Sequence, residues 1–497
     1  MDGTREDIIA EIDEWCEDLD ARRNVLWISG SPGVGKSAIA RKLATRLKSS
    51  HRFGSSFFLQ RELASLQTAA NLWRAIAYDL SQEYPSARSV IISKLKDREI
   101  DLGNAGAREL FGSLVEAPLE PSTDIPPGRL PVVLIDGVDE CGGLDGLRSK
   151  NRYILLQGIK AWTRLAPRFK LIVTSRPEDD ISRELSAISH RIELGSGQNV
   201  SLLSSRDIYS FLSYEFARVA SRYSTLSPEW PGESVIDEFT KRSAGLFIYA
   251  DTLIKFVDEG QPREQLERIS SEPLHHESLT QLYRQILDVS FKNPSPSVLE
   301  AFKNTTGTII LAKIPLYRQD IVHLLNLEPT MLEHICKGLQ SVLDHGDLLR
   351  FTHQSFVDFL MDSMGCFPSF LFNNAIQSCT LLLGSLRIMK NELKFNICKL
   401  ETSHVIHDDI PCIETQVCAN ISMHLQYACC FWTDHIHGCD FDVQIAEEVE
   451  LFMTCQFLFW LEVMSLLRKV NCVTQGLRLV MKWSKVSVVM AILQDII

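Results

Sequence analysis

The sequence lacks an excess of positive charge. Its 51 Lys and Arg residues are outnumbered by 63 Asp and Glu residues, so the formal net charge is −12 at pH 7. A protein that binds the phosphate backbone of DNA or RNA needs a basic face. The charge balance therefore predicts that nucleic acid is not a partner.

Long apolar runs are also missing. No run of about 18 residues, the length that crosses a bilayer, is free of charge. The most apolar stretch, CQFLFWLEVMSLL from Cys455, is short and is interrupted by Glu462. We therefore expect a core helix there, and we do not expect a membrane as a partner.

A secretory signal is missing as well, because the first residues are acidic and have no apolar core. The chain has 13 cysteines, an odd number. Both features indicate reduced thiols and a cytoplasmic protein. The sequence has no internal repeat and no low-complexity tract. With 497 residues of ordinary composition, the chain is expected to form about three or four domains.

The first part of the chain alternates strand-like and helix-like segments, which is typical of a parallel α/β sheet. Helical patterns follow the first two strands, at residues 37–47 and 69–84. The Pro-rich segment 117–131 is expected to be a surface loop. The five expected strands are residues 24–30, 53–60, 130–136, 170–176 and 190–195.

From about residue 201 the sequence changes to helical periodicity. Helical patterns cover residues 205–220, 234–257 and 278–291. A hairpin-like stretch, DLLRFTH from Asp347, runs into a further helix, and the chain is helical again after Cys366. The sequence therefore predicts one α/β domain followed by several helical ones.

A phosphate-binding loop follows the first expected strand. The segment GSPGVGKS fits the pattern G-x-x-x-x-G-K-[ST] and lies between a strand and a helix, as the chemistry requires. Lys36 is expected to contact the β- and γ-phosphates, and Ser37 to ligate Mg²⁺. The expected nucleotide-binding residues here are Gly30, Ser31, Pro32, Gly33, Val34, Gly35, Lys36, Ser37 and Ala38.

An acidic cluster follows the third expected strand. Asp136 ends that strand, at the place of the second magnesium-holding acid. The next position, Gly137, offers no carboxylate, whereas Asp139 and Glu140 are candidates to orient or deprotonate the attacking water. A strand-end acid that faces water is the alternative for Asp136, and an exposed acidic loop is the alternative for the other two.

Arg176 ends the fourth expected strand in the segment TSRPEDD. The carboxyl ends of parallel strands meet at one sheet edge, so its guanidinium is a candidate sensor of the γ-phosphate. A surface salt bridge that anchors the end of the strand is the alternative.

Several motifs together resemble the NACHT branch of the STAND signal-transduction NTPases, in particular its large fungal set. Three of them, GSPGVGKS, LIDGVDE and TSRPE, have the order and spacing of that family. The similarity covers nearly the whole chain, through GTREDIIAEIDEW, FFLQRE, AGLFIYADTLIKF, LLRFTHQSFVDFL, LKFNICKLE and LQYACCFW.

The resemblance implies four domains held closed by ADP, which open and self-associate through the NTPase domain when ATP replaces ADP. The implied ligands are therefore ATP or ADP with Mg²⁺, and the implied activity is slow ATP hydrolysis that resets a signalling switch. The expected domains are a NACHT P-loop NTPase domain at 1–198, a small helical domain at 199–275, a winged-helix domain at 276–363 and a second helical domain at 364–497.

The resemblance also implies three more nucleotide contacts. His353 matches a winged-helix histidine that reaches the β-phosphate of ADP, and a histidine buried at a helix start is the alternative. Arg5 fits the adenine-side motif at the N-terminus of the domain. Many relatives place a proline on adenine in a Gly-x-Pro element, but this chain has Phe247 there, which either stacks on the base or fills the core.

Two other hypotheses stay open. His424, His435 and His437 lie near Cys429, Cys430 and Cys439, which suggests a zinc site as the alternative to buried thiols. The adenine-side motif begins at residue 3 and the chain ends at AILQDII, without the effector domain and sensor repeats usual in the family. A regulatory or scaffold fragment that binds nucleotide without hydrolysis is therefore the alternative to a slow ATPase switch.

Overall fold

The computed structural model describes residues 4–97, 99–102, 105–120, 125, 130–270, 278–344, 346–401, 404 and 409–494. The chain divides into two compact units, Met1–Leu282 and Tyr283–Ile497. Each unit is described by itself. The four domain boundaries expected from the sequence are finer than this division and stay predictions.

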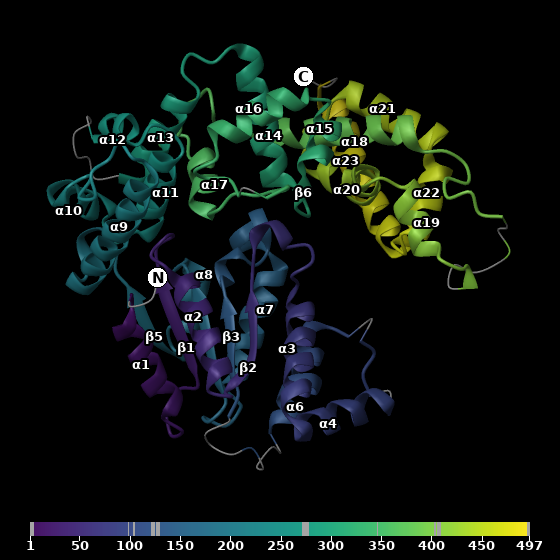
Figure 1. The fold of residues 1–497 in the computed structure, drawn as a ribbon. Helices are drawn as coiled ribbons and strands as arrows, with labels where there is room; N and C mark the ends of the chain where they lie inside the picture. Colours follow the sequence, from purple (N-terminus) through teal and green to yellow (C-terminus); the bar gives the residue numbers. More distant parts are fainter. Residues whose placement is uncertain are drawn as a thin grey trace. The chain divides into compact units, whose positions relative to one another are not determined.

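The first unit contains a five-stranded sheet in the order β2-β3-β4-β1-β5, and every pair of neighbours is parallel (Figure 1). The predicted α/β fold with a parallel sheet is thus confirmed. β1, β3 and β4 are buried along their whole length, as expected for central strands covered on both faces. The strands are β1 Val25–Gly30, β2 Phe53–Phe58, β3 Val132–Asp136, β4 Lys170–Ser175 and β5 Ser189–Leu194.

Alternate residues of each strand point into two separate cores, one on each face of the sheet. On β1, Leu26 and Ile28 pack with α1 (Glu6–Glu17) and α2 (Lys36–Ser49). Val25 and Trp27 point to the other core, which holds the larger set of helices. That set comprises α3 (Ala69–Glu83), α4 (Pro85–Lys96), α5 (Ala107–Phe111), α7 (Lys150–Trp162) and α8 (Asp179–Leu185).

The start of the Pro-rich segment is helical, which corrects the expectation of a loop from Ala117. A π-helical turn, η2 (Gly112–Glu116), leads directly into α6 (Ala117–Leu119). Pro118 and Leu119 are both buried, and burial of Leu119 favours the helix. Pro118 lies where the hydrogen-bond pattern changes, so its missing N–H is tolerated. Residues 121–124 and 126–129 of the expected loop lie outside the described residues.

Among the described residues after β5, the first unit contains helices and short turns and no further strand, as predicted. The pattern expected to be helical over residues 234–257 is interrupted, because Ala244 and Gly245 have positive φ values of 48° and 83°. The helices are α9 (Leu202–Arg222), α10 (Glu233–Ser243), α11 (Phe247–Asp258), α12 (Pro262–Ser270) and α13 (Ser278–Ser290), the last of which spans the division. Short 3-10 turns in this unit are η1 (Arg61–Leu63), η4 (Val138–Glu140), η5 (Gly143–Arg148) and η6 (Gly197–Asn199).

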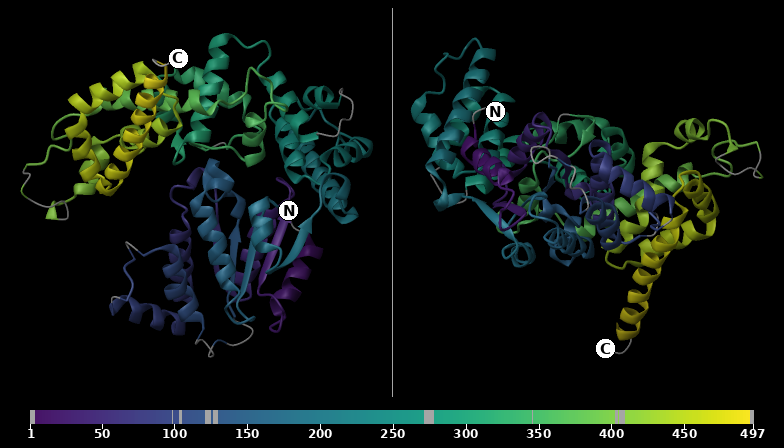
Figure 2. Two further views of the ribbon diagram at one scale, coloured as in Figure 1. Left: turned by 180° about the vertical axis from the view of Figure 1, so that it is seen from behind. Right: turned by 90° about the horizontal axis from the view of Figure 1, so that it is seen from below.

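In its described residues the second unit consists of helices, one small sheet and an isolated bridge between Leu343 and Phe351. In that sheet β6 (Leu316–Tyr317) pairs antiparallel with β7 (Leu348–Leu349), which belongs to the stretch expected to be hairpin-like. Figure 2 shows the long yellow helix α23 in the view from below. The helices are α14 (Pro296–Leu311), α15 (Arg318–Leu325), α16 (Pro329–Gly338), α17 (Gln354–Met361), α18 (Asn374–Glu392), α19 (Ile413–Asn420), α20 (Met423–Gly438), α21 (Val443–Cys455), α22 (Phe457–Leu466) and α23 (Val470–Gln494).

The most apolar stretch of the sequence forms α22 and the end of α21. Trp460 and Val463 of α22 are buried, and the Trp460 indole donates to the Cys429 carbonyl oxygen at 2.8 Å. Among the described residues no single helix has the length and composition to span a membrane. The pair of α21 and α22 meets that test only when taken together, and it is bent by 72°.

Candidate functional site

The phosphate-binding loop joins β1 to α2, as the motif predicted. Gly35 is the N-cap of α2 with a φ of 97° and no side-chain cap, so the first amides of the helix are open to an anion. The Lys36 ammonium donates to the carbonyl oxygens of Gly30 at 2.8 Å and Ser31 at 3.0 Å. The Lys36 side chain therefore lies along the loop that is expected to hold the phosphates.

Burial lowers the pKa of Lys36, and the carboxylates of Asp139 and Asp136 oppose that effect. Arg176 lowers the same pKa further. The loop lysine, both acids and the arginine thus act on one another at one end of the sheet. These are the residues that the sequence selected from three separate motifs.

Asp136 and Ser37, the two expected magnesium ligands, are in contact. Burial raises the pKa of Asp136, and hydrogen bonds from Thr174 and Ser37 lower it. The Thr174 hydroxyl donates to Asp136 Oδ1 at 2.5 Å. A hydroxyl and a carboxylate are hard oxygen donors of the kind that Mg²⁺ prefers. The pair therefore fits a magnesium ion held between the loop and β3.

The backbone conformation at position 137 favours glycine and disfavours a glutamate directly after Asp136. The φ of Gly137 is 75°, and a Cβ added there would lie 3.1 Å from the Leu59 carbonyl oxygen. Its amide donates to the Thr174 hydroxyl at 3.0 Å. Only glycine adopts such a conformation without strain. The next carboxylates come from η4, one turn later.

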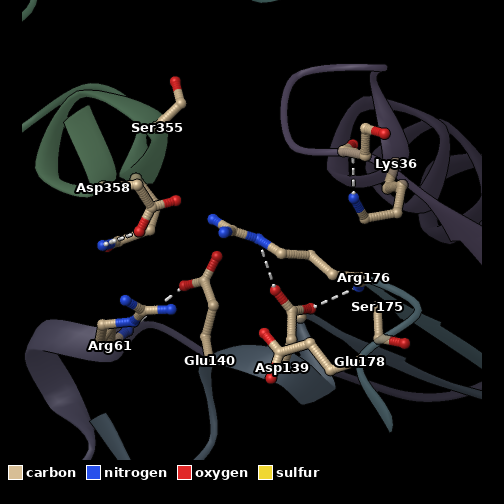
Figure 3. A network of polar contacts seen from close by, with 12 residues as sticks. Lys36, Arg61, Asp139, Glu140, Ser175, Arg176, Glu178, Ser355 and Asp358 are labelled. Carbon is tan, nitrogen blue, oxygen red and sulfur yellow. Dashed lines mark hydrogen bonds and ion pairs between the residues drawn. The ribbon is translucent and has the colours of Figure 1, made fainter. Parts of the chain in front are cut away.

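Asp139 is buried and holds Arg176 through two contacts (Figure 3). Asp139 Oδ1 accepts from the Arg176 amide at 3.0 Å, and Asp139 Oδ2 lies 3.1 Å from Arg176 Nε. The acid is only 3% exposed, so the pair differs from the surface salt bridge considered as the alternative for Arg176. Asp139 is therefore placed to orient the arginine.

Glu140 lies on the other side of the same turn, beside the start of η1 (Figure 3). Its carboxylate accepts from the Arg61 amide at 3.3 Å. Burial, together with Asp139 and Glu62, raises the pKa of Glu140 to about 8, against a lowering by Arg61. Sequence reasoning missed Arg61, which stood only inside the FFLQRE segment quoted for the resemblance.

Arg152 is a second residue that sequence reasoning missed. Its buried guanidinium donates to Glu178 Oε2 at 2.7 Å, to Asp180 Oδ1 at 2.8 Å and to the Asp139 carbonyl oxygen at 3.4 Å. It therefore ties η4 to the start of α8. In the sequence, the burial of Arg152 could have been recognised from its position on the apolar stripe of α7, because Leu155, Leu156 and Ile159 follow three, four and seven residues later.

The expected adenine-side residues lie against the loop. The Arg5 amide donates to Asp207 Oδ2 at 2.9 Å, and its guanidinium donates to the Val34 carbonyl oxygen at 3.1 Å. That guanidinium is 5.2 Å from the ring centre of Phe247, the first residue of α11. The next amide, of Ile248, donates to the Gly33 carbonyl oxygen at 3.2 Å. Asp207 was not identified from the sequence, where it stands in an ordinary helical pattern.

His353 belongs to the second unit and is the N-cap of α17. Its Nδ1 accepts from the Ser355 amide at 3.1 Å and lies 2.6 Å from the Ser355 hydroxyl. That hydroxyl is 2.8 Å from the Tyr283 hydroxyl. The position at a helix start is the one named in the alternative, a structural histidine, but the side chain is half-buried and not buried. Its contact with a nucleotide stays a prediction.

The cysteines and histidines considered for zinc have other contacts. His435 Nε2 lies 2.8 Å from the Tyr427 hydroxyl, and the Cys439 thiol donates to the His435 carbonyl oxygen at 3.3 Å. Burial raises the pKa of Cys429 well above its ordinary value. No group of three or more metal-ligating side chains occurs in the described part of the chain.

Comparison with known proteins gives relatives for both halves of the chain. Residues 3–176 match the family model described as Nephrocystin 3, N-terminal. Vegetative incompatibility protein HET-E-1 of Podospora anserina is 24% identical over 92% of this chain, and the chain spans about a third (34%) of that protein.

Two solved structures are similar at low sequence identity. One is a STAND protein with a tetratricopeptide repeat sensor from Pyrococcus horikoshii, with 13% identity and a TM-score of 0.39, covering 97% of this chain and 64% of that one. The other is a Walker-type ATPase of Pyrococcus abyssi, with 15% identity and a TM-score of 0.35, covering 70% of this chain and 95% of that one.

Proposed function

We propose that this chain is a nucleotide-controlled signalling switch. The family model and HET-E-1 support its resemblance to NACHT/STAND-like proteins, on which the proposed switch is based. The switch binds ATP or ADP with Mg²⁺ and hydrolyses ATP slowly to reset itself. Its NTPase domain self-associates when ATP is bound. The name of the Podospora anserina relative favours a role in fungal self/non-self recognition or innate-immunity-like signalling.

The geometry around Gly137 is the observation that carries slow hydrolysis. A carboxylate beside the magnesium acid would be strained by the φ of 75° and by the close Leu59 carbonyl oxygen, and the residue there is a glycine. Asp139 is occupied by Arg176, which leaves Glu140 as the group to accept a proton from water. Its pKa of about 8 keeps most of it protonated at neutral pH. A site with a weakly available base turns over slowly.

The remaining residues take the roles expected from their positions. Ser37 and Asp136 would hold Mg²⁺, which would supply positive charge against the negative charge that develops on the phosphates. Lys36 exchanges its two carbonyl acceptors for phosphate oxygens when nucleotide binds. Asp139 orients Arg176 toward the γ-phosphate, a positioning role that its two contacts support.

The adenine side and the domain coupling follow the family resemblance. We assign Arg5 and Phe247 to the base, because Arg5 contacts the loop that would hold the phosphates and the Phe247 ring lies against the Arg5 guanidinium. The domains proposed are 1–198, 199–275, 276–363 as a winged helix, and 364–497. His353 in the third of these would sense the β-phosphate of ADP and so couple the closed arrangement to the nucleotide.

Nucleotide content and self-association test the proposal. Purified protein is expected to release adenine nucleotide on denaturation, and Lys36→Ala is expected to abolish both retention and ATP-dependent self-association. Lys48→Ala, at the other end of α2, is the matched control and should behave as wild type. A Lys36→Ala protein that retains nucleotide and self-associates normally would contradict the proposal.

A regulatory fragment that holds nucleotide without hydrolysis is the second candidate function. It is favoured by the raised pKa of Glu140, because a protonated carboxyl cannot act as a base. Single-turnover hydrolysis separates the two. Hydrolysis that is lost in Glu140→Gln supports the switch, whereas no turnover in wild type at any pH up to about 9, above the Glu140 pKa, supports the fragment.

A further inference from the structure

Two cysteine thiols meet where α18 packs along α20 in the second unit. Cys379 is half-buried on α18, and Cys439 is the buried C-cap of α20. Both are free thiols, and each side chain shifts the pKa of the other. They are 60 positions apart in the sequence, so no short sequence motif indicates that they form a pair.

The helix backbones approach closely at this level, independently of the thiols. A Cβ added at Gly438, next to Cys439, would lie 2.4 Å from the hydroxyl of Ser378, next to Cys379. The absence of a side chain at Gly438 therefore permits the contact. A disulfide requires a short separation of the two backbones, and the approach of Ser378 to Gly438 brings the helices together one residue from each cysteine.

The same corner connects two more helices. The Trp483 indole of α23 donates to the Cys439 carbonyl oxygen at 3.2 Å. Asp442 caps α21 by accepting from the amides of Gln444 and Ile445 at 2.8 and 3.2 Å. A covalent bond at Cys439 would thus fix α18 to the point where α20, α21 and α23 meet.

We propose that Cys379 and Cys439 form a peroxide-sensitive thiol pair that closes to a reversible disulfide within the second unit. The inference concerns a modification site separate from the nucleotide site and does not rest on the proposed function. Cys379 is the attacking thiol because it is the partly exposed member. Cys439 is the resolving thiol.

The chemistry needs a hydroperoxide as the two-electron oxidant. The Cys379 thiolate sulfur attacks one peroxide oxygen, the O–O bond breaks and hydroxide leaves, which converts Cys379 to a sulfenic acid. The Cys439 sulfur then attacks the Cys379 sulfur, the S–O bond breaks, and water leaves with the Cys439 proton. In total the two thiols lose two electrons and two protons, and hydrogen peroxide becomes two water molecules.

The environment of the pair favours this division of roles. The interaction with the Cys439 side chain lowers the pKa of Cys379, against raising effects of burial, Asp440 and Asp442. The same interaction and burial raise the pKa of Cys439. By contrast, burial raises the pKa of Cys16 and of Cys141 to about 12. Thiolates are the reactive form, so Cys379 is expected to react before these buried thiols.

Peptide mapping of the intact protein tests the pair. The reduced protein is treated with stoichiometric hydrogen peroxide, and free thiols are alkylated at successive times before digestion without reductant. We expect a linked peptide containing Cys379 and Cys439 to appear at least about threefold faster than any oxidation of the exposed Cys412, Cys418, Cys455 and Cys472. Dithiothreitol should remove it, and the oxidised protein should melt about 5 °C higher or more.

Three variants keep the test decisive. Cys439→Ser should leave Cys379 as a sulfenic acid that a 1,3-diketone probe labels, and Cys379→Ser should abolish both the link and the label. Cys418→Ser, an exposed cysteine in the same unit, should change nothing. Oxidation of Cys379 that is no faster than that of the exposed cysteines, or a link from Cys379 to another cysteine, would overturn the proposal. Neither result depends on nucleotide binding, so failure here leaves the proposed function untouched.

Discussion

The two compact units bury polar side chains in different ways. In the first, Asp136, Asp139 and Thr174 are buried together at the carboxyl end of neighbouring strands. In the second, buried polar residues such as Thr306 and Ser385 lie along helices, and their hydroxyls donate to the carbonyl oxygens of Phe302 and Leu381 in their own helices. Convergent polar groups make a site, whereas dispersed and locally satisfied ones serve packing.

The largest expected effect tests whether the convergent group is a magnesium site. Asp136→Asn keeps the shape of the side chain but removes the charge, so we expect single-turnover ATP hydrolysis to fall at least about a hundredfold. Hydrolysis should be measured against Mg²⁺ concentration. Asp237→Asn, on the exposed face of α10, is the control. An unchanged rate of ATP hydrolysis in Asp136→Asn would mean that the convergent polar residues of the first unit do not form a magnesium site, and the proposed difference between the two units would then fail.

Breaking the Arg152 network is the next largest effect. Arg152→Met leaves Glu178 and Asp180 without their buried partner, so we expect the free energy of unfolding to fall by about 2–4 kcal/mol. Arg164→Met breaks the exposed pair with Glu116 and should cost less than about 1 kcal/mol. Denaturant unfolding of the nucleotide-free protein measures both. Equal losses would mean that the buried contacts of Arg152 contribute no more to stability than an exposed ion pair.

Gly137→Ala tests the backbone conformation that separates this site from one with an adjacent glutamate. Strain at a φ of 75° and contact with the Leu59 carbonyl oxygen should together lower the free energy of unfolding by about 1–3 kcal/mol. Gly197→Ala provides the matched control, because Gly197 has a φ of 65° but open space around it. Gly197→Ala should lower the free energy of unfolding by less than Gly137→Ala does, and the difference should be the cost of the contact with the Leu59 carbonyl oxygen.

A pH profile of hydrolysis tests Glu140 as the base. Its pKa of about 8 means that the carboxylate accumulates as the pH rises through 8, so the single-turnover rate should increase about tenfold between pH 7 and 9. Glu140→Gln should abolish hydrolysis, or leave a residual rate without this rise. A wild-type rate that is flat over the same range would exclude Glu140 and return the role to another acid.

The first unit could be predicted further than the second, for a physical reason. The five strands and the loop from Gly30 to Ser37 were found because contiguous residues determine them. The pairing of Asp139 with Arg176 was not foreseen, since it joins the ends of two strands through side-chain orientation. Arg152 and Arg61 were missed for the same reason.

In the second unit the sequence predicted helices but not their contacts. The helical periodicity of α18 and α20 follows from local spacing. Which residue of one helix meets which residue of the other depends on packing that no single segment encodes. The contact of Cys379 with Cys439 and that of the Trp460 indole with the Cys429 carbonyl oxygen are examples. The histidine and cysteine spacing near residue 435 therefore suggested zinc, whereas the structure gives these side chains other partners.

The smallest predicted effect tests whether the buried polar groups of the second unit are indeed structural. The Tyr427 hydroxyl contacts His435 Nε2, and burial lowers the pKa of that imidazole to about 3, so it is neutral. Tyr427→Phe removes the hydroxyl and leaves the nitrogen buried without it, which should cost about 1–2 kcal/mol of unfolding free energy. Tyr78→Phe, whose side chain is 65% exposed, should cost almost nothing. Nucleotide retention should be the same in both variants, because the contact between Tyr427 and His435 lies within α20 and does not involve the phosphate-binding loop. A Tyr427→Phe protein that loses nucleotide at unchanged stability would show instead that this buried pair is coupled to the site in the first unit.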